Sequence, residues 1–113
     1  MPSFYEFAIE LDGKLIGSIS VYLSDNRASG DLGWILNKKY WNNGYATEAA
    51  KALKDFALNI LQVKKLTANC DYRNIASSRV MEKIGLKLES NNSIRVYPGE
   101  NEPVHELMYS LIV

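Results

Sequence analysis

The sequence predicts a single α/β domain in which a mixed, mostly antiparallel sheet carries one long and one short helix. Three observations favour this α+β fold class. The first third of the chain has strand-like segments separated by turn dipeptides. The middle has a sustained apolar stripe at helical spacing, and the last third returns to strands. No internal repeat, low-complexity tract or flexible linker divides the chain, so we expect one continuous domain over residues 1–113.

The N-terminal part of the chain is expected to form three strands. Residues 4–11 are rich in aromatic and aliphatic side chains and end at Asp12-Gly13, a strong hairpin turn. Residues 14–23 form the second strand, and Ser24-Asp25-Asn26 has the chemistry of a turn. Residues 30–36 then read as a third, short strand. The first two strands are therefore predicted to pair as a hairpin.

The middle of the chain is predicted to contain both helices. Apolar residues recur at the spacing of one helix face: Ala46, Ala49, Ala50, Leu53, Phe56, Ala57, Ile60 and Leu61. Residues 65–71 read as a strand, and a shorter helix follows over about residues 75–84. Gly85 stands where a left-handed C-cap would end that helix.

The remaining residues are predicted to return to the sheet. Residues 86–90 and 94–97 are two candidate strands, and Asn91-Asn92 has the composition of a turn between them. A polar loop over residues 98–103 precedes a final, mostly apolar strand over residues 105–113. If that last strand lay unpaired at the edge of the sheet, it would invite pairing with another chain.

Composition and charge argue against several classes of function. Thirteen basic residues balance thirteen acidic ones, so the chain lacks the electrostatic footprint of a nucleic-acid or anionic-membrane binder. With one Cys and one His, neither an intrachain disulfide nor a Cys/His zinc site is expected, and no metal site is predicted. No apolar run reaches the ~18 residues of a membrane span, and the N-terminus does not resemble a signal peptide. We therefore expect a reducing, cytoplasmic setting.

The most informative segment is the loop that leads into the long helix, over residues 41–49. The first turn of a helix presents N–H groups without intrahelical partners, and the helix dipole favours an anion there. Gly44 lets the backbone approach an anion closely. Neither a Walker A sequence nor Gly-x-Gly-x-x-Gly is present. The loop is thus either an anion site of another type or a plain turn before a core helix.

A second motif favours the anion site. Asn74-Ile75-Ala76-Ser77 opens the short helix, and Lys83-Ile84-Gly85-Leu86 closes it. With Trp41-Asn42-Asn43-Gly44-Tyr45-Ala46 and the strand Asp31-Leu32-Gly33-Trp34-Ile35-Leu36, these motifs resemble the GNAT superfamily of acyl-CoA-dependent N-acetyltransferases. The subgroup named for the ribosomal-protein acetyltransferases RimJ and RimL is the most similar. Trp41 stands in the Gln/Arg position of the family motif Gln/Arg-x-x-Gly-x-Gly/Ala. The resemblance covers about residues 7–112.

The resemblance implies that acetyl-CoA is the cosubstrate. Its pantetheine arm would lie between the third strand and the strand that follows the long helix. The residues implied to bind it are Trp34, Ile35 and Leu36 through the main chain, Asn42, Asn43, Gly44, Tyr45 and Ala46 at the pyrophosphate, and Asn74 and Ser77 along the arm. Trp34 and Trp41 are open to either reading, as core residues or as walls of the cofactor site.

The implied reaction moves an acetyl group to a primary amine by direct attack. Ser77 is the candidate donor to the leaving thiolate, with helix capping as its alternative role. Asp31 matches an acidic position of the family and is the candidate base, or else a solvated charge at a strand end. Many relatives carry a Tyr acid where Met81 stands, and Met81 is expected in the core. Cys70 is expected to behave as a small buried hydrophobe.

The strand and helix pair that usually open the family fold have no counterpart here. The chain is either a natural short version, a gene fragment, or one copy of an assembly in which a second copy completes the acceptor wall. Because an uncovered sheet face would expose apolar side chains, we expect a homodimer with two-fold symmetry. The acceptor is expected to be a small-molecule or peptide amine. The alternatives are a non-catalytic acyl-CoA-binding or interaction module, and nucleotide phosphate binding unrelated to acyl transfer.

Overall fold

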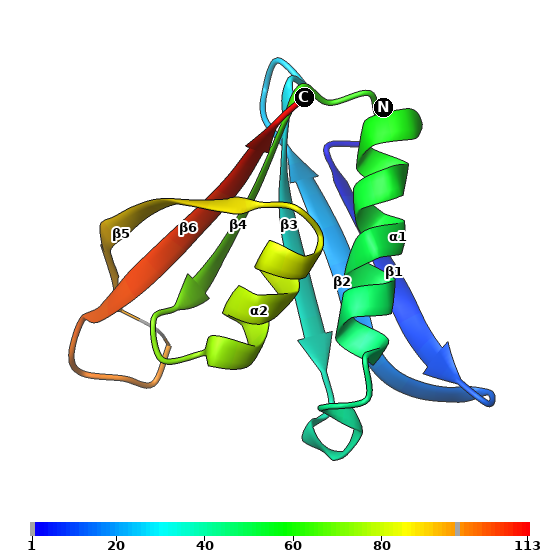
Figure 1. Cartoon of the computed structure of the whole chain (residues 1–113), viewed down its shortest axis with the longest axis horizontal. Coiled ribbons are helices and arrows are strands. Elements are labelled where there is room, and N and C mark those ends of the chain that lie inside the picture. The colour runs from blue at the N-terminus through cyan, green and yellow to red at the C-terminus, as the bar shows by residue number, and fades with distance from the viewer. Residues whose placement is uncertain (1, 97) are drawn as a thin grey trace.

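Six strands form one twisted sheet and two helices pack on one of its faces in the computed structural model, which describes residues 2–96 and 98–113 (Figure 1). In chain order the elements are β1 (Phe4–Leu11), β2 (Lys14–Leu23), β3 (Ser29–Leu36), a 3-10 turn (Lys38–Tyr40), α1 (Tyr45–Asn59), β4 (Lys65–Asp71), α2 (Ile75–Lys83), β5 (Lys87–Arg95) and β6 (Val104–Ile112). The strand order in space is β1-β2-β3-β4-β6-β5. Among the described strands only β3 and β4 pair in parallel, so the mixed, mostly antiparallel fold class is confirmed.

Local turn and cap signals place most element boundaries where the sequence predicts them. Asp12 and Gly13 both have positive φ, as a two-residue hairpin turn requires, and β1 pairs with β2 around them. Gly85 ends α2 with a φ of +99°, which confirms the predicted left-handed C-cap. Lys54 of α1 donates to the carbonyl of Ile84 at 2.5 Å and so ties the two helices together at this end. The long helix itself ends earlier than its apolar stripe, because Ile60 is its C-cap.

The predicted turn at Asn91-Asn92 is wrong. Both residues belong to the continuous strand β5, which pairs with β6 through two register shifts. Such irregularities absorb extra residues and bend a strand without reversing the chain, so pairing with β6 overrides the local turn tendency. Ile94 and Arg95 end the same strand, and Tyr97, the last residue of the predicted strand over 94–97, lies outside the described residues.

The last strand does not lie at the edge of the sheet, where its sequence had made pairing with another chain a possibility. β6 lies inside the sheet with β4 on one side and β5 on the other, and the edges are β1 and β5. Strand order is set by pairing between segments far apart in the chain, which alternation within one strand cannot reveal.

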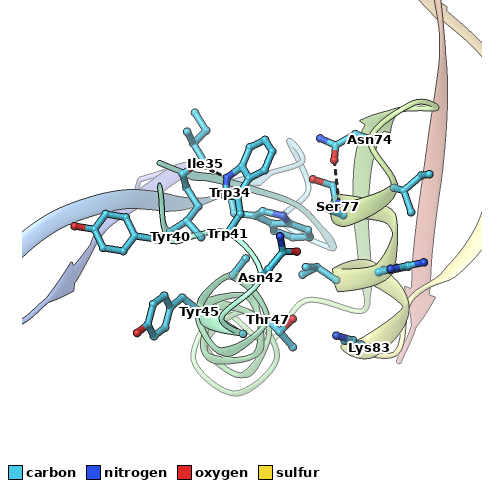
Figure 2. A pocket seen from close by; sticks show the side chains of 17 residues that line it. Trp34, Ile35, Tyr40, Trp41, Asn42, Tyr45, Thr47, Asn74, Ser77 and Lys83 are labelled. Atoms are coloured by element: carbon cyan, nitrogen blue, oxygen red, sulfur yellow. Dashed lines mark hydrogen bonds between the residues drawn. The ribbon is translucent and has the colours of Figure 1, made fainter. Parts of the chain in front are cut away.

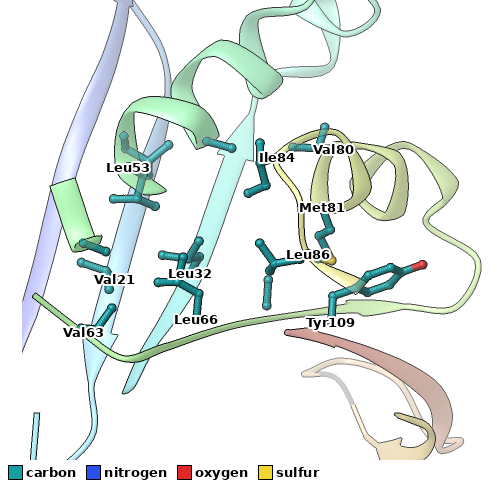
Figure 3. Packing of buried hydrophobic residues seen from close by; sticks show 14 of the residues in the cluster. Val21, Leu32, Leu53, Val63, Leu66, Val80, Met81, Ile84, Leu86 and Tyr109 are labelled. Carbon is teal, nitrogen blue, oxygen red and sulfur yellow. The ribbon is translucent and has the colours of Figure 1, made fainter. Parts of the chain in front are cut away.

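The hydrophobic core lies between the sheet and the two helices (Figure 3). Its largest fully buried side chains come from β2, α1, β4 and α2 and from the segments that follow the two helices: Leu53, Leu66, Met81, Ile84, Val21 and Val63. Met81 and Cys70 are both buried, as predicted. Strand alternation sends Leu66, Ala68 and Cys70 of β4 into this core and places the intervening Thr67 and Asn69 on the opposite face.

The face of the sheet opposite the helices, here called the far face, has no helix on it among the described residues. Ile19, Val21 and Leu23 of β2 are buried in the core cluster that α1 completes. On the far face, Phe4 and Tyr22 stack with their ring centroids 4.2 Å apart and remain exposed, as does Ile35. The hairpin strands therefore do present apolar side chains to both faces.

Within the part of the chain that the structure describes, no helix combines the length and apolar character needed to cross a membrane.

Candidate functional site

The site begins where two parallel strands part. β3 and β4 pair over only four positions, from Ser29 opposite Lys65 to Leu32 opposite Ala68. Beyond this point β3 continues along β2 to Leu36, whereas β4 continues along β6. Figure 1 shows the two strands diverging, and we call the point where their pairing ends the apex. The backbone groups of β3 that face the gap have no strand partner there, so they are open to a ligand that can form hydrogen bonds.

The open end of β3 forms one wall of a cleft of about 670 Å³ (Figure 2). The other walls are the loop after β3, the first turn of α1 and the exposed side of α2. This volume is in the usual range for small-molecule sites. Nine of the ten residues predicted to bind the cofactor line the cleft: Trp34, Ile35, Leu36, Asn42, Gly44, Tyr45, Ala46, Asn74 and Ser77.

The loop into α1 is held by its own side chains and leaves the helix terminus open. Gly44 is the N-cap of α1 with a left-handed φ of +79°, and no side chain caps the helix. The first N–H groups of α1 are therefore open to a ligand, and the helix dipole makes this end favourable for an anion. Asn43 does not line the cleft. Its side-chain amide donates to the carbonyls of Tyr40 and Trp41, at 3.3 and 3.1 Å, and so fixes the loop.

Trp41 closes the loop against the end of β3. Its indole N–H donates to the Leu36 carbonyl at 2.8 Å, while the ring stays about half exposed on the cleft wall. Trp34 lines the same cleft and also packs against the hydrophobic core. Figure 2 shows both indoles across the cleft from Asn74 and Ser77. Trp41 is therefore a wall residue, and Trp34 belongs to both the core and the wall.

The start of α2 presents a hydroxyl to the cleft. Asn74 is the N-cap of α2, and its Oδ1 accepts the N–H of Ser77 at 3.1 Å (Figure 2). Asn74 thus performs the capping that the sequence left open as an alternative role for Ser77. The Ser77 hydroxyl has no hydrogen-bond partner among the described residues. It is free to contact a ligand in the cleft, and the side-chain NH₂ of Asn74 can donate beside it.

Two cations line the cleft that the sequence reasoning did not assign to the site. Arg79 and Lys83 are four residues apart on α2, on the face that also holds Ala76 and Val80. Figure 2 shows Lys83 beside Thr47, which belongs to the first turn of α1. A spacing of four residues puts both cations on one face of a helix. Which face it was became apparent only from the packing of α2 against α1.

Asp31 lies on the far face, one position before the apex, and does not line the cleft. Its Oδ1 accepts a 2.7 Å hydrogen bond from the Thr67 hydroxyl and a 3.3 Å bond from the Asn69 amide. Burial raises the pKa of Asp31, and the Thr67 hydrogen bond opposes that rise. Asp31 is therefore a partly buried, hydrogen-bonded carboxylate and not a freely solvated charge at a strand end.

Two further potentially reactive side chains, Cys70 and His105, lie outside the cleft. Burial raises the pKa of the Cys70 thiol, which favours the unreactive protonated form. His105 is exposed and meets the Tyr72 ring edge-on, with 6.1 Å between the ring centroids. Among the residues that the structure describes, no group of three or more His, Cys, Asp or Glu side chains is arranged to hold a metal ion.

Comparison with protein families gives one clear match. A family model described as an acetyltransferase (GNAT) domain matches residues 1–87. An uncharacterized N-acetyltransferase of Bacillus subtilis, YnaD, is 35% identical over 98 residues, which are 87% of this chain and 57% of that protein. Spermidine N(1)-acetyltransferase of Escherichia coli is 27% identical over 84 residues, which are 74% of this chain and 45% of that protein. The chain spans about half the length of the curated relatives it matches.

Solved structures agree with this assignment. A GNAT-family acetyltransferase from Bacillus anthracis superposes with a TM-score of 0.84 at 33% identity, over 95% of this chain and 65% of that one. The ribosomal alpha-N-protein acetyltransferase RimL, in complex with coenzyme A, superposes with the same TM-score of 0.84 at 18% identity, over 98% of this chain and 63% of that one. The second likeness shows a shared fold only.

Proposed function

Because this chain belongs to the GNAT acetyltransferase family, we propose that it transfers an acetyl group from acetyl-CoA to a primary amine. One observation carries the proposal. The unpaired edge of β3 and the uncapped first turn of α1 border the same cleft. An extended amide chain that ends in a pyrophosphate needs both of these features, because its amides require backbone partners and its phosphates require N–H donors.

The residues of the cleft fit acetyl-CoA from one end to the other. The pantetheine arm would bond the main chain of Trp34, Ile35 and Leu36, although the Leu36 carbonyl already accepts the Trp41 indole. The pyrophosphate would lie on the main chain of residues 42–46. A Cβ at Gly44 would meet no atom within 4 Å, so the backbone there is open to close approach. Lys83, which lies beside Thr47 of the first turn of α1 (Figure 2), and Arg79 also line the cleft and add positive charge.

The proposed chemistry divides between two side chains. Acetyl-CoA supplies the activated acyl carbon when it is bound. Asp31 takes a proton from the acceptor ammonium, so that the neutral nitrogen can form the new C–N bond as the C–S bond breaks. Ser77 donates a hydrogen bond from its hydroxyl to the sulfur that leaves as a thiolate. After the C–N bond forms, the nitrogen loses its second proton and the thiolate gains one, so the products are an N-acetylated amine and CoA.

We place the chain with the RimJ and RimL subgroup. The strand Asp31-Leu32-Gly33-Trp34-Ile35-Leu36 supports this placement. The acceptor is a small-molecule or peptide amine, and the similarity to spermidine N(1)-acetyltransferase makes polyamines the first compounds to test. We expect a cytoplasmic setting and neither nucleic acid nor membrane as partner, since the net charge is zero.

We further propose that residues 1–113, as a single acyl-CoA-binding domain, form a two-fold homodimer. The support is that the far face exposes apolar side chains, namely the stacked rings of Phe4 and Tyr22 and, further along the sheet, Ile35. Light scattering or sedimentation at micromolar concentration should report about twice the 12.8 kDa chain mass. A monomer that remains soluble at this concentration contradicts the dimer.

The acetyltransferase proposal is tested by mixing the purified chain with acetyl-CoA and a panel of amines and following release of free thiol. Thiol release that depends on both the amine and the protein is the expected result. Binding of CoA without thiol release with any amine would indicate a non-catalytic acyl-CoA-binding module. Displacement of CoA by ATP would indicate general nucleotide phosphate binding instead.

A further inference from the structure

We propose that Thr67 is a positioning residue that holds the Asp31 carboxylate ionised and fixed in one orientation for proton transfer, with Asn69 in a supporting role. The inference rests on the proposed acetyl transfer, in which Asp31 accepts the proton of the acceptor amine. Thr67 itself touches no reacting atom and acts only through Asp31.

The geometry of the sheet brings the three side chains together. Asp31 and Thr67 stand opposite each other in the parallel pairing of β3 and β4, and their side chains share the far face. Asn69 is the next residue of β4 on that face and reaches the same carboxylate. Both donors bond Oδ1, at 2.7 and 3.3 Å. No described residue forms a hydrogen bond with Oδ2, which is therefore the oxygen available to an amine.

Asp31 and its two hydrogen-bond donors lie next to the gap between the strands, where a carboxylate held in one orientation is useful. Only one further pair, Leu32 opposite Ala68, follows Asp31 before the strands part. Beyond it the two backbones no longer pair, so the hydrogen bonds from Thr67 and Asn69 to Asp31 are the last side-chain ties between β3 and β4 on the far face of the described chain. A carboxylate at this point borders the gap, and the hydrogen bond prevents it from turning away toward β2.

The charges around Asp31 explain why its ionised form needs support. Burial is the largest influence and raises the pKa of Asp31, and the nearby Glu106 of β6 raises it further. Arg95 of β5 lowers that pKa, and its guanidinium lies 3.6 Å from Glu106. Tyr22 of β2 is opposite Asp31 in the register. The Thr67 hydroxyl is the main group that lowers the pKa of Asp31 by direct contact.

The test compares substitutions that differ in a single hydroxyl. Thr67→Val keeps the branched shape and removes the donor, whereas Thr67→Ser keeps the donor. Ser110→Ala is the matched control, because Ser110 stands opposite Thr67 on β6 and forms no hydrogen bond with Asp31. The first readout is the pKa of Asp31, measured by carbon NMR of the carboxyl group in the protein without substrate. The second is the pH dependence of kcat/KM, whose acidic limb reports the base of the free enzyme.

In Thr67→Val we expect the pKa of Asp31 to rise and the acidic limb of kcat/KM to move to higher pH by the same amount. At a fixed pH on that limb, kcat/KM should fall roughly tenfold, because a hydrogen bond to a charged group is lost. Thr67→Ser and Ser110→Ala should keep the wild-type pKa and profile. If Thr67→Val does not fold, Asn69→Ala replaces an exposed side chain and should give a smaller rise, since its bond is longer.

An Asp31 pKa that stays at the wild-type value in Thr67→Val overturns the inference. A pKa that rises while the pH profile does not move also overturns it, because the base would then be another group. If the wild-type chain transfers no acetyl group to any amine, the proposed function fails. The NMR titration still reports separately whether Thr67 controls Asp31.

Discussion

Replacing Gly44 with valine should weaken CoA binding because a side chain there blocks the approach of the pyrophosphate, and Gly13 provides a matched control. The two glycines have nearly the same left-handed φ, +79° and +78°, and a Cβ on either would meet no atom within 4 Å. Valine at either site therefore strains the backbone without a steric clash. The expected loss is about 1–2 kcal/mol or more in the free energy of unfolding at each site, since β-branched residues avoid this region.

The two sites differ only in what surrounds them. Gly13 lies in the hairpin turn between β1 and β2, whereas Gly44 lines the cleft and begins α1. A side chain at residue 44 would enter the space through which a pyrophosphate reaches the helix N–H groups. We expect CoA affinity to fall at least tenfold in Gly44→Val, which corresponds to about 1.4 kcal/mol, and to stay unchanged in Gly13→Val.

Calorimetry measures the affinity directly, and tryptophan fluorescence provides a second signal because Trp34 and Trp41 line the cleft. Urea unfolding of both variants checks that their stabilities fall equally. A wild-type CoA affinity in the folded Gly44→Val variant would refute the placement of the pyrophosphate at this loop. An equal loss of affinity in both would show that general destabilisation, and not the site, controls binding.

Three further changes test separate parts of the site. Ser77→Ala should lower kcat more than it raises the KM for acetyl-CoA, because a donor to the leaving sulfur acts mainly in the transition state. Steady-state kinetics measure both constants, and a change in KM alone would make Ser77 a binding residue. Asp31→Asn should lower kcat/KM by about a hundredfold or more, as loss of a general base does. Because burial raises the pKa of Asp31, its ionised form destabilises the fold at neutral pH. Thermal unfolding should therefore show a more stable Asp31→Asn variant at pH 7, with the difference disappearing below about pH 4, where the carboxyl is protonated in both states. Lys83→Met should weaken CoA binding several-fold and reduce its dependence on salt, and an unchanged salt dependence in titrations would remove Lys83 from the anion site.

Features with a local physical cause were predictable from the sequence. The Asp12-Gly13 turn, the stripe of α1 and the cap at Gly85 each depend on a few neighbouring residues. The failures depend on distant partners. Asn91-Asn92 lies in a register shift of β5 because Ser90 and Ser93 on either side of it pair with β6, and β6 is internal because β4 and β5 lie on either side of it. No property of these segments by themselves shows such pairings.

The residues of the candidate site show the same difference between local features and contacts with distant residues. The family resemblance implied Trp34, Gly44, Asn74 and Ser77 as cofactor residues, and all four line the cleft. Gly44 and Asn74 also have a local role, because each is the N-cap of a helix. The contact of Asp31 with Thr67 joins residues 36 positions apart, and only the parallel pairing of β3 with β4 creates it. The sequence therefore proposed Asp31 as a base but gave no reason for its altered environment.

One feature of the strand order accounts for both halves of the site. β3 stays paired with β2 and β4 stays paired with β6, so the parallel pair β3–β4 separates after four positions. On the helix side the separation exposes the backbone edge that borders the cleft, with Ser77 across from it. On the far face the last paired positions hold Asp31 against Thr67. The proposed base and the proposed hydroxyl donor therefore lie on opposite faces of the sheet. They are not in direct contact, and in the proposed reaction each would reach the acetyl group from its own side of the gap beyond the apex.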